Sequence, residues 1–195
     1  MVSKRIAARK PPESIYVLRV DLVHVKPAVW RRLEVAADIT LAGLHRAIQM
    51  AFDWTDSHLH GFEIGGRRYG PRMPEFRDME TDDLDERKFR LRDVASAGSR
   101  FTYTYDFGDD WHHLIKVEKA LAPTPGAHYP RCTAGRNAAP PEDCGGPWGY
   151  AEMRQALADP RHPERDDLLD WLDEDFDPTE FDREELNAGF EMLKL

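Results

Sequence analysis

The stretch from Arg100 to Leu121, RFTYTYDFGDDWHHLIKVEKAL, constrains the fold more than any other part of the chain. Large side chains alternate with polar ones on both sides of a central glycine, and this period of two is typical of paired β-strands. The alternating residues are Phe101, Tyr103, Tyr105 and Phe107, followed by Trp111, His113, Ile115 and Val117. Because Gly108, Asp109 and Asp110 favour a turn, the stretch predicts a β-hairpin.

Three further segments extend this hairpin into a sheet with a helix. Apolar residues alternate over residues 15–35 and predict a second hairpin that turns at Lys26-Pro27. Helical spacing predicts a helix from Leu41 to Phe52, and a strand is expected from His58 to Ile64, before a turn at Gly65-Gly66. We therefore expect an α+β fold: a mixed β-sheet of two hairpins and a central strand with one helix packed across it, similar to a β-grasp.

The length of 195 residues is enough for one well-cored domain. We expect a disordered basic arm at residues 1–13 and a single domain at 14–195. Within the domain, the expected parts are a sheet and helix core at 14–122, a proline- and glycine-rich loop at 123–149 and an acidic segment of three short helices at 150–195.

The charge of the chain lies mainly in its last quarter. The net charge is −9, and residues 151–195 hold 15 acidic and 5 basic residues. A surface with this excess of acidic residues repels the phosphates of a nucleic acid, so nucleic acid is not an expected partner. No apolar run is long enough to span a membrane and no secretory signal is seen, so the expected location is the cytoplasm, with no membrane contact. In that reducing compartment the two cysteines are expected to be free thiols.

Several stretches together resemble one known family. These are WTDSHLHGFEI, YDFGDDWHHLIKVE, YPRCTAGRNAAPPEDCGGPWGY and the closing Leu-Trp-Leu and Phe-Asp-Pro region. From about Ile15 to Phe190 the chain resembles the Ri-plasmid Orf-three-like family, whose members are often labelled TnpR-type passenger proteins of transposable elements. The resemblance implies an association with plasmids and mobile elements, and it implies no activity. A serine recombinase needs a nucleophilic serine among arginines and a helix-turn-helix module, and the five serines lie in no such setting.

The hairpin also concentrates groups that carry chemistry. A turn at residues 108–110 would place Phe107 opposite Trp111, Tyr105 opposite His113 and Asp106 opposite His112. A carboxylate beside an imidazole orients a histidine for acid-base work or for holding a metal ion. A register slip of one residue would pair Asp106 with His113 instead, so the partner of this aspartate is left open.

A divalent metal ion such as zinc is one hypothesis for this region. His58 and His60 are two residues apart, which places both rings on one face of a strand. The candidate metal ligands are His58, His60, Asp106, His112, Cys132 and Cys144. Glu142 and Asp143 are the candidate catalytic residues, as general base. With a metal ion bound, the chain would be a hydrolase acting on nucleic acid or nucleotides.

The other hypothesis is a non-enzymatic binding or protein-interaction module, and whether the chain is an enzyme is left open. Its expected site for a protein or a small ligand consists of Tyr105, Asp106, Asp109, Asp110, Trp111, His113 and Trp148. A purely structural role is the third alternative. Glu142 and Asp143 would then accept hydrogen bonds from the amides of Gly145 and Gly146 and pin the long loop to the hairpin.

Overall fold

The computed structural model of the protein describes residues 12–72, 83–172 and 176–195. Residues 1–11 of the expected basic arm therefore lie outside the described residues. The strands are β1 (Ile15–Leu22), β2 (Trp30–Ala36), β3 (His60–Ile64), β4 (Arg67–Gly70), β5 (Leu84–Asp85), β6 (Arg100–Tyr105), β7 (Trp111–Leu121) and β8 (Arg131–Arg136). The helices are α1 (Leu41–Ala51), η2 (Glu86–Lys88), α2 (Leu91–Val94), α3 (Gly146–Ala158), α4 (Arg165–Trp171) and α5 (Arg183–Met192).

One mixed sheet contains all the described strands, in the order β5-β4-β3-β6-β7-β1-β2-β8. Only the pair β4 and β5 is parallel among them. The predicted α+β class with a mixed sheet and a helix across it is confirmed. The sheet is wider than expected, because β4, β5 and β8 join the five strands that sequence alternation had indicated. β8 lies inside the segment that we expected to be loop, where it pairs with β2 through backbone hydrogen bonds.

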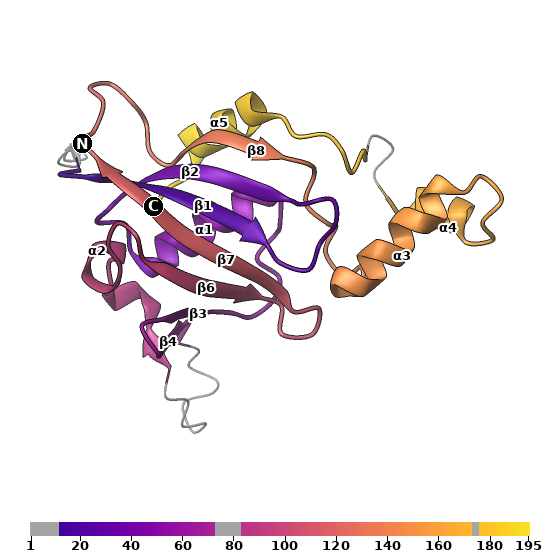
Figure 1. The fold of residues 1–195 in the computed structure, drawn as a ribbon, viewed down its shortest axis with the longest axis horizontal. Helices are drawn as coiled ribbons and strands as arrows, with labels where there is room; N and C mark the ends of the chain where they lie inside the picture. The colour runs from indigo at the N-terminus through magenta and orange to yellow at the C-terminus, as the bar shows by residue number, and fades with distance from the viewer. Residues whose placement is uncertain (1–11, 73–82, 173–175) are drawn as a thin grey trace, which may run out of the picture.

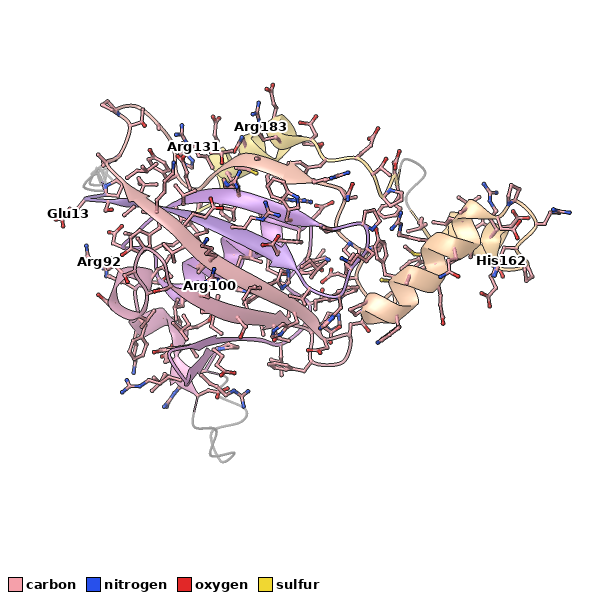
Figure 2. The ribbon with its side chains drawn as sticks, in the orientation of Figure 1. Glu13, Arg92, Arg100, Arg131, His162 and Arg183 are labelled. Atoms are coloured by element: carbon pink, nitrogen blue, oxygen red, sulfur yellow. The ribbon has the colours of Figure 1, made fainter. Side chains whose placement is uncertain are left out.

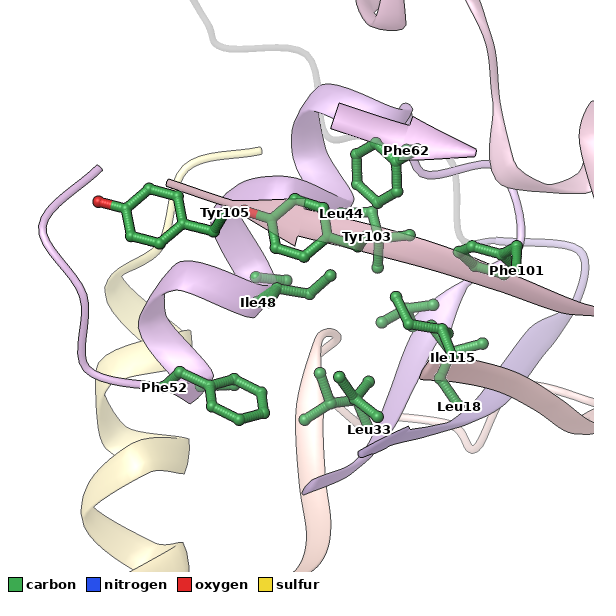
Figure 3. Close-up of a cluster of buried hydrophobic side chains, with 14 of the residues drawn as sticks. Leu18, Leu33, Leu44, Ile48, Phe52, Phe62, Phe101, Tyr103, Tyr105 and Ile115 are labelled. Carbon is green, nitrogen blue, oxygen red and sulfur yellow. The ribbon is translucent and has the colours of Figure 1, made fainter. Parts of the chain in front are cut away.

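The core lies between the sheet and α1, which is behind the sheet in Figure 1. Thr40 caps α1 by accepting a hydrogen bond from the amide of Gly43, and the apolar face of the helix is buried. Figure 3 shows Leu44, Ile48 and Phe52 facing side chains from β1, β2, β6 and β7. The helix predicted from Leu41 to Phe52 is therefore present, and it carries the chain directly to the loop that precedes β3.

The β6–β7 hairpin is present, but its predicted register is wrong. Tyr105 pairs with Trp111, Thr104 with His112 and Tyr103 with His113. The turn is longer than expected because Asp106 takes a left-handed conformation, with φ of 54°, and its carbonyl accepts a hydrogen bond from the amide of Asp110 at 2.7 Å. The shift amounts to two residues, so the same side chains still face the core.

The C-terminal helices are present as predicted, although α3 begins at Gly146 rather than near Tyr150. Asp182 caps α5 by accepting hydrogen bonds from the amides of Glu184 and Glu185. α5 packs against β8 and α1, whereas α3 and α4 form a pair that points away from the sheet. His162 marks the far end of this pair in Figure 2. No helix among the described residues has the length and apolar character needed to cross a membrane.

Candidate functional site

Three segments that are far apart in the sequence meet beside the β6–β7 turn. They are residues 53–59 after α1, residues 106–110 in the turn, and residues 139–146 before α3. The indole Nε1 of Trp54 donates a hydrogen bond to the carbonyl of Pro140 at 2.9 Å, and the amide of Gly145 donates one to Asp109 Oδ2 at 3.1 Å. We call the region formed by these three segments the acidic corner.

Glu142 connects two of the segments. One carboxylate oxygen accepts hydrogen bonds from the amide and the hydroxyl of Thr55, and the other accepts the hydroxyl proton of Tyr105. The Tyr105 oxygen in turn accepts from the amides of Ser57 and His58, at 3.0 and 3.3 Å. Burial, followed by the hydrogen bond to Glu142, raises the pKa of Tyr105. Glu142 therefore fixes the relative positions of the loops, as the structural alternative to a catalytic role proposed, but its partners are Thr55 and Tyr105 rather than the glycine amides.

The acidic corner is rich in carboxylates. Its three segments contain seven carboxylates and one histidine, and neither lysine nor arginine. Five aspartates of the three segments have positive φ angles, namely Asp53, Asp56, Asp106, Asp110 and Asp143. Aspartate tolerates this conformation better than most residues, so part of the acidity serves the backbone of the turns. The accumulated negative charge is nevertheless a property of the folded corner, and it attracts cations.

His58, Asp106 and Asp143 come together within this corner, one from each segment. Their ligand atoms all lie within 4.8 Å of one another. The Nε2 atom of His58 is 3.0 Å from Asp143 Oδ1 and 3.8 Å from Asp106 Oδ2. This nitrogen is shielded from solvent, yet it makes no hydrogen bond with acceptable geometry to either carboxylate. The His58 side chain as a whole is 31% exposed, and the described residues contain three other shielded nitrogens without a hydrogen-bond partner, at Trp111 Nε1, His113 Nε2 and Arg154 Nε.

A second group of titratable residues lies deeper, between α1 and β3. The rings of His45 and His60 stack with centroids 3.4 Å apart and planes within 6° of parallel. His45 bonds to Asp56 Oδ1 at 2.8 Å, and His60 bonds to Glu86 Oε2 at 2.9 Å. Burial lowers the pKa of His45 to about 3, so this imidazole is neutral. The ligand atoms of His45, Asp56 and His60 also lie within 4.8 Å of one another, but both nitrogens of His45 are already hydrogen-bonded, to Tyr103 and Asp56, and His60 Nε2 is bonded to Glu86. This group is therefore a hydrogen-bonded network inside the core.

The structure thus separates the residues that were predicted as metal ligands. His60 belongs to the stacked pair, and it does not share a site with His58 as the strand spacing had indicated. His112 lies on the outer face of the hairpin, where its Nδ1 atom shares a hydrogen bond with the hydroxyl oxygen of Thr104 at 3.0 Å. Both cysteines are free; Cys132 is buried beside Asn187, and burial raises the pKa of the Cys144 thiol to about 12. Only His58 and Asp106 of the predicted ligands meet, and Asp143 joins them.

The predicted ligand-site residues also divide into two groups. Trp111 and His113 are completely buried under the corner, where Trp54 packs on both rings. Trp148, by contrast, is 84% exposed, and Phe107 at the hairpin tip is 53% exposed. Prediction from the sequence missed Trp54 as a residue of the site. The stretch WTDSHLHGFEI, which was part of the family resemblance, was the signal that could have identified it.

A cavity of about 220 Å³ opens beside the corner, where the loop that holds Glu142 faces the end of α4. Apolar side chains in its lining include Phe52, Pro140, Trp171 and Phe176, and the surface of the cavity as a whole is of mixed polarity. The carboxylates of Asp53 and Glu142 also line it. A cavity that has both apolar side chains and acidic residues in its lining offers surroundings for the aliphatic part and for the charged end of a cationic side chain.

Comparison with known proteins gives close relatives over nearly the whole chain. A protein of Sinorhizobium fredii described as "Uncharacterized protein y4hQ" is 38% identical over 183 residues, and the match covers 92% of each chain. The crystal structure of a protein of unknown function, MM3350 from Methanosarcina mazei Go1, has a TM-score of 0.83 and 39% identity, and the match covers 90% of this chain and 98% of that one. The model of the plasmid pRiA4b ORF-3-like proteins matches residues 14–185, and the chain therefore belongs to that family.

Proposed function

We propose that the protein is a non-enzymatic binding module that captures a basic segment of a partner protein at the acidic corner. The observation that carries the proposal is the meeting of three segments that together contain seven carboxylates and no lysine or arginine of their own, held in place by Glu142 and Asp109. Arg31 and Arg46 lie near Asp53 and Asp56 respectively, so the uncompensated charge is that of the other carboxylates. Fixed loops keep these charges together in the absence of the partner, so little ordering is needed when it binds.

The surroundings of the corner support a polypeptide ligand. Phe107 and Trp148 offer exposed aromatic faces next to the carboxylates, where arginine and lysine side chains bind by cation–π contact. The cavity beside Glu142 has a volume of about 220 Å³, which is enough for one side chain and too small for a whole cofactor. Together these features match an interface in which apolar anchors are surrounded by complementary charge.

The hydrolase alternative has less support. Glu142, the expected general base, has both carboxylate oxygens engaged by Thr55 and Tyr105, so it is poorly placed to take a proton from water. The concentration of carboxylates in the corner also repels the phosphates of the expected substrates, nucleic acid and nucleotides.

The proposal predicts that charge removal at the corner weakens the binding of a basic peptide. The probe is fluorescein-labelled nona-arginine, measured by fluorescence anisotropy in the presence of a metal chelator. The double variant Asp110→Asn, Asp143→Asn keeps residues that tolerate positive φ. We expect it to raise Kd by roughly twofold to thirtyfold, since each of the two lost charge pairs contributes about 0.2–1 kcal/mol. Trp148→Ala, added to this double variant, should raise Kd further because it removes the exposed aromatic face next to the carboxylates.

A matched control separates the corner from the general acidity of the chain. The double variant Asp166→Asn, Glu191→Gln changes the net charge by the same amount on exposed positions of α4 and α5. We expect its Kd to equal that of the unmodified protein. An equal loss of affinity in both double variants would show that the peptide responds to net charge alone, and the proposed site would be wrong.

A further inference from the structure

We infer that the acidic corner also holds one divalent transition-metal ion, of the zinc class, through His58 Nε2 and one carboxylate oxygen each from Asp106 and Asp143. The inference rests on the proposed function in one respect, because both assign a cation to the same corner. It identifies a separate ligand; Asp143 takes part in both tests, and the chelator in the peptide experiment keeps the two results separate.

The geometry of the three ligand atoms carries the inference. His58 Nε2 lies 3.0 Å from Asp143 Oδ1 and 3.8 Å from Asp106 Oδ2. An ion with bonds of about 2.1 Å places neighbouring ligand atoms roughly 3.0–3.5 Å apart, depending on whether the angle between them is right or tetrahedral. The separation of 3.0 Å lies within this range and that of 3.8 Å is slightly beyond it, and all three ligand atoms lie within 4.8 Å of one another, so binding of an ion would draw the Asp106 oxygen closer.

The surroundings of the His58 nitrogen agree with this geometry, and its side chain is 31% exposed, so an ion can reach it from solvent. Nε2 is shielded from solvent and has no hydrogen bond, although two carboxylates lie next to it. A metal ion placed between the nitrogen and the two oxygens gives the nitrogen a partner and relieves the repulsion between the carboxylates.

The donor set decides the class of ion. One imidazole nitrogen and two carboxylate oxygens suit zinc, manganese, cobalt or iron, whereas magnesium and calcium favour oxygen donors alone. The Asp143 side chain is 70% exposed and that of Asp106 only 12%, so the ion would be supported from the protein side and open to solvent on the other. Three protein ligands with an open position leave room for water or for a donor atom of a bound partner.

The test uses the full-length protein after removal of metal by a chelator. Isothermal titration with Zn²⁺ should give one site per chain, and Co²⁺ should give visible absorption bands of a bound ion. His58→Ala and Asp143→Asn should each weaken Zn²⁺ binding by at least about tenfold. His162→Ala, at the far end of the α3–α4 pair, should bind Zn²⁺ as the unmodified protein does.

Two results would overturn the inference: absence of Zn²⁺ and Co²⁺ binding, or unchanged binding in Asp143→Asn. Because Asp143 is exposed, this variant decides the matter even if His58→Ala fails to fold. Binding that is lost in His45→Gln but kept in Asp143→Asn would assign the ion to the stacked pair instead. The peptide experiment is done with chelator present, so failure of the metal site leaves the proposed function standing, and failure of peptide binding leaves the metal site standing.

Discussion

Acidification from about pH 6.5 to pH 4.5 should lower the free energy of unfolding by several kcal/mol, because two buried histidines must remain neutral in the folded protein. His113 is completely buried among Phe52, Trp54 and Tyr103, and burial lowers its pKa to about 3. His45 has its pKa lowered to about 3 for the same reason. Both groups start from an ordinary value of 6.5, to which they return when the chain unfolds.

The direction of this pH dependence follows from the number of protons that the folded and unfolded states bind. Between about pH 6.5 and pH 3 the unfolded chain binds protons at these histidines and the folded protein does not, so stability is complete above the unfolded pKa and is lost as the pH falls. Each histidine contributes a slope of up to about 1.4 kcal/mol per pH unit within that window. Asp56 acts in the opposite direction, because burial raises its pKa and its protonation favours the folded state.

Urea unfolding between pH 4.5 and pH 8, followed by circular dichroism, measures this dependence. The variant His113→Leu cannot take up the proton, so its stability should depend on pH about half as steeply as that of the unmodified protein. His162→Gln, which alters a histidine outside the core, should leave the slope unchanged. A free energy of unfolding that stays constant from pH 8 to pH 5 would show that these two imidazoles are not buried as described.

The second large effect is expected at Gly146, where the loop before α3 touches the hairpin. Gly146 has a φ of 67°, and a Cβ atom placed on it would overlap the carbonyl oxygen of Asp109. Gly146→Ala should lower the free energy of unfolding by about 3 kcal/mol or more, because it combines an unfavourable backbone conformation with a steric clash. The same substitution should separate the 139–146 segment from the turn.

Gly66 provides a matched control in the turn between β3 and β4. Its φ is 74°, but a Cβ atom there would have no neighbour within 4 Å. Gly66→Ala should therefore cost only the backbone term, about 1 kcal/mol. Thermal unfolding of both variants checks the comparison, at about 2–4 °C per kcal/mol for a chain of this size. Equal losses for the two glycines would show that the loop does not lie against Asp109.

Local sequence patterns predicted the strands and the helix whose apolar residues alternate or recur at regular spacing. The alternation around Gly108 predicted β6 and β7, and the apolar spacing after Thr40 predicted α1. β8 escaped prediction because an edge strand such as Arg131–Arg136 needs backbone pairing with β2 and little alternation of its own. The register of the β6–β7 hairpin was predicted wrongly, because the apolar pattern does not reveal the left-handed conformation of Asp106 that lengthens the turn.

The candidate site was predicted only in part, because local sequence patterns indicate single segments and do not indicate how remote segments meet. Residues of the YDFGDDWHH stretch were expected to contribute, and Asp106 and Asp109 do lie in the corner. Their partners depend on contacts between segments that are remote in the sequence. Glu142 meets Thr55 across 87 positions of the chain, and no local pattern in either segment indicates the other. The ligand group of His58, Asp106 and Asp143 arises in the same way, from three segments that only the folded sheet brings together.

The most direct test of cation binding at the acidic corner is a two-dimensional amide NMR spectrum recorded with small additions of Mn²⁺. The paramagnetic ion broadens the signals of nearby amides. We predict that broadening begins at residues 56–59, 106–110 and 142–146, and that it is lost at these positions in Asp143→Asn. Broadening that begins on the acidic faces of α4 and α5 would place the preferred cation site on the C-terminal helices and would contradict this account.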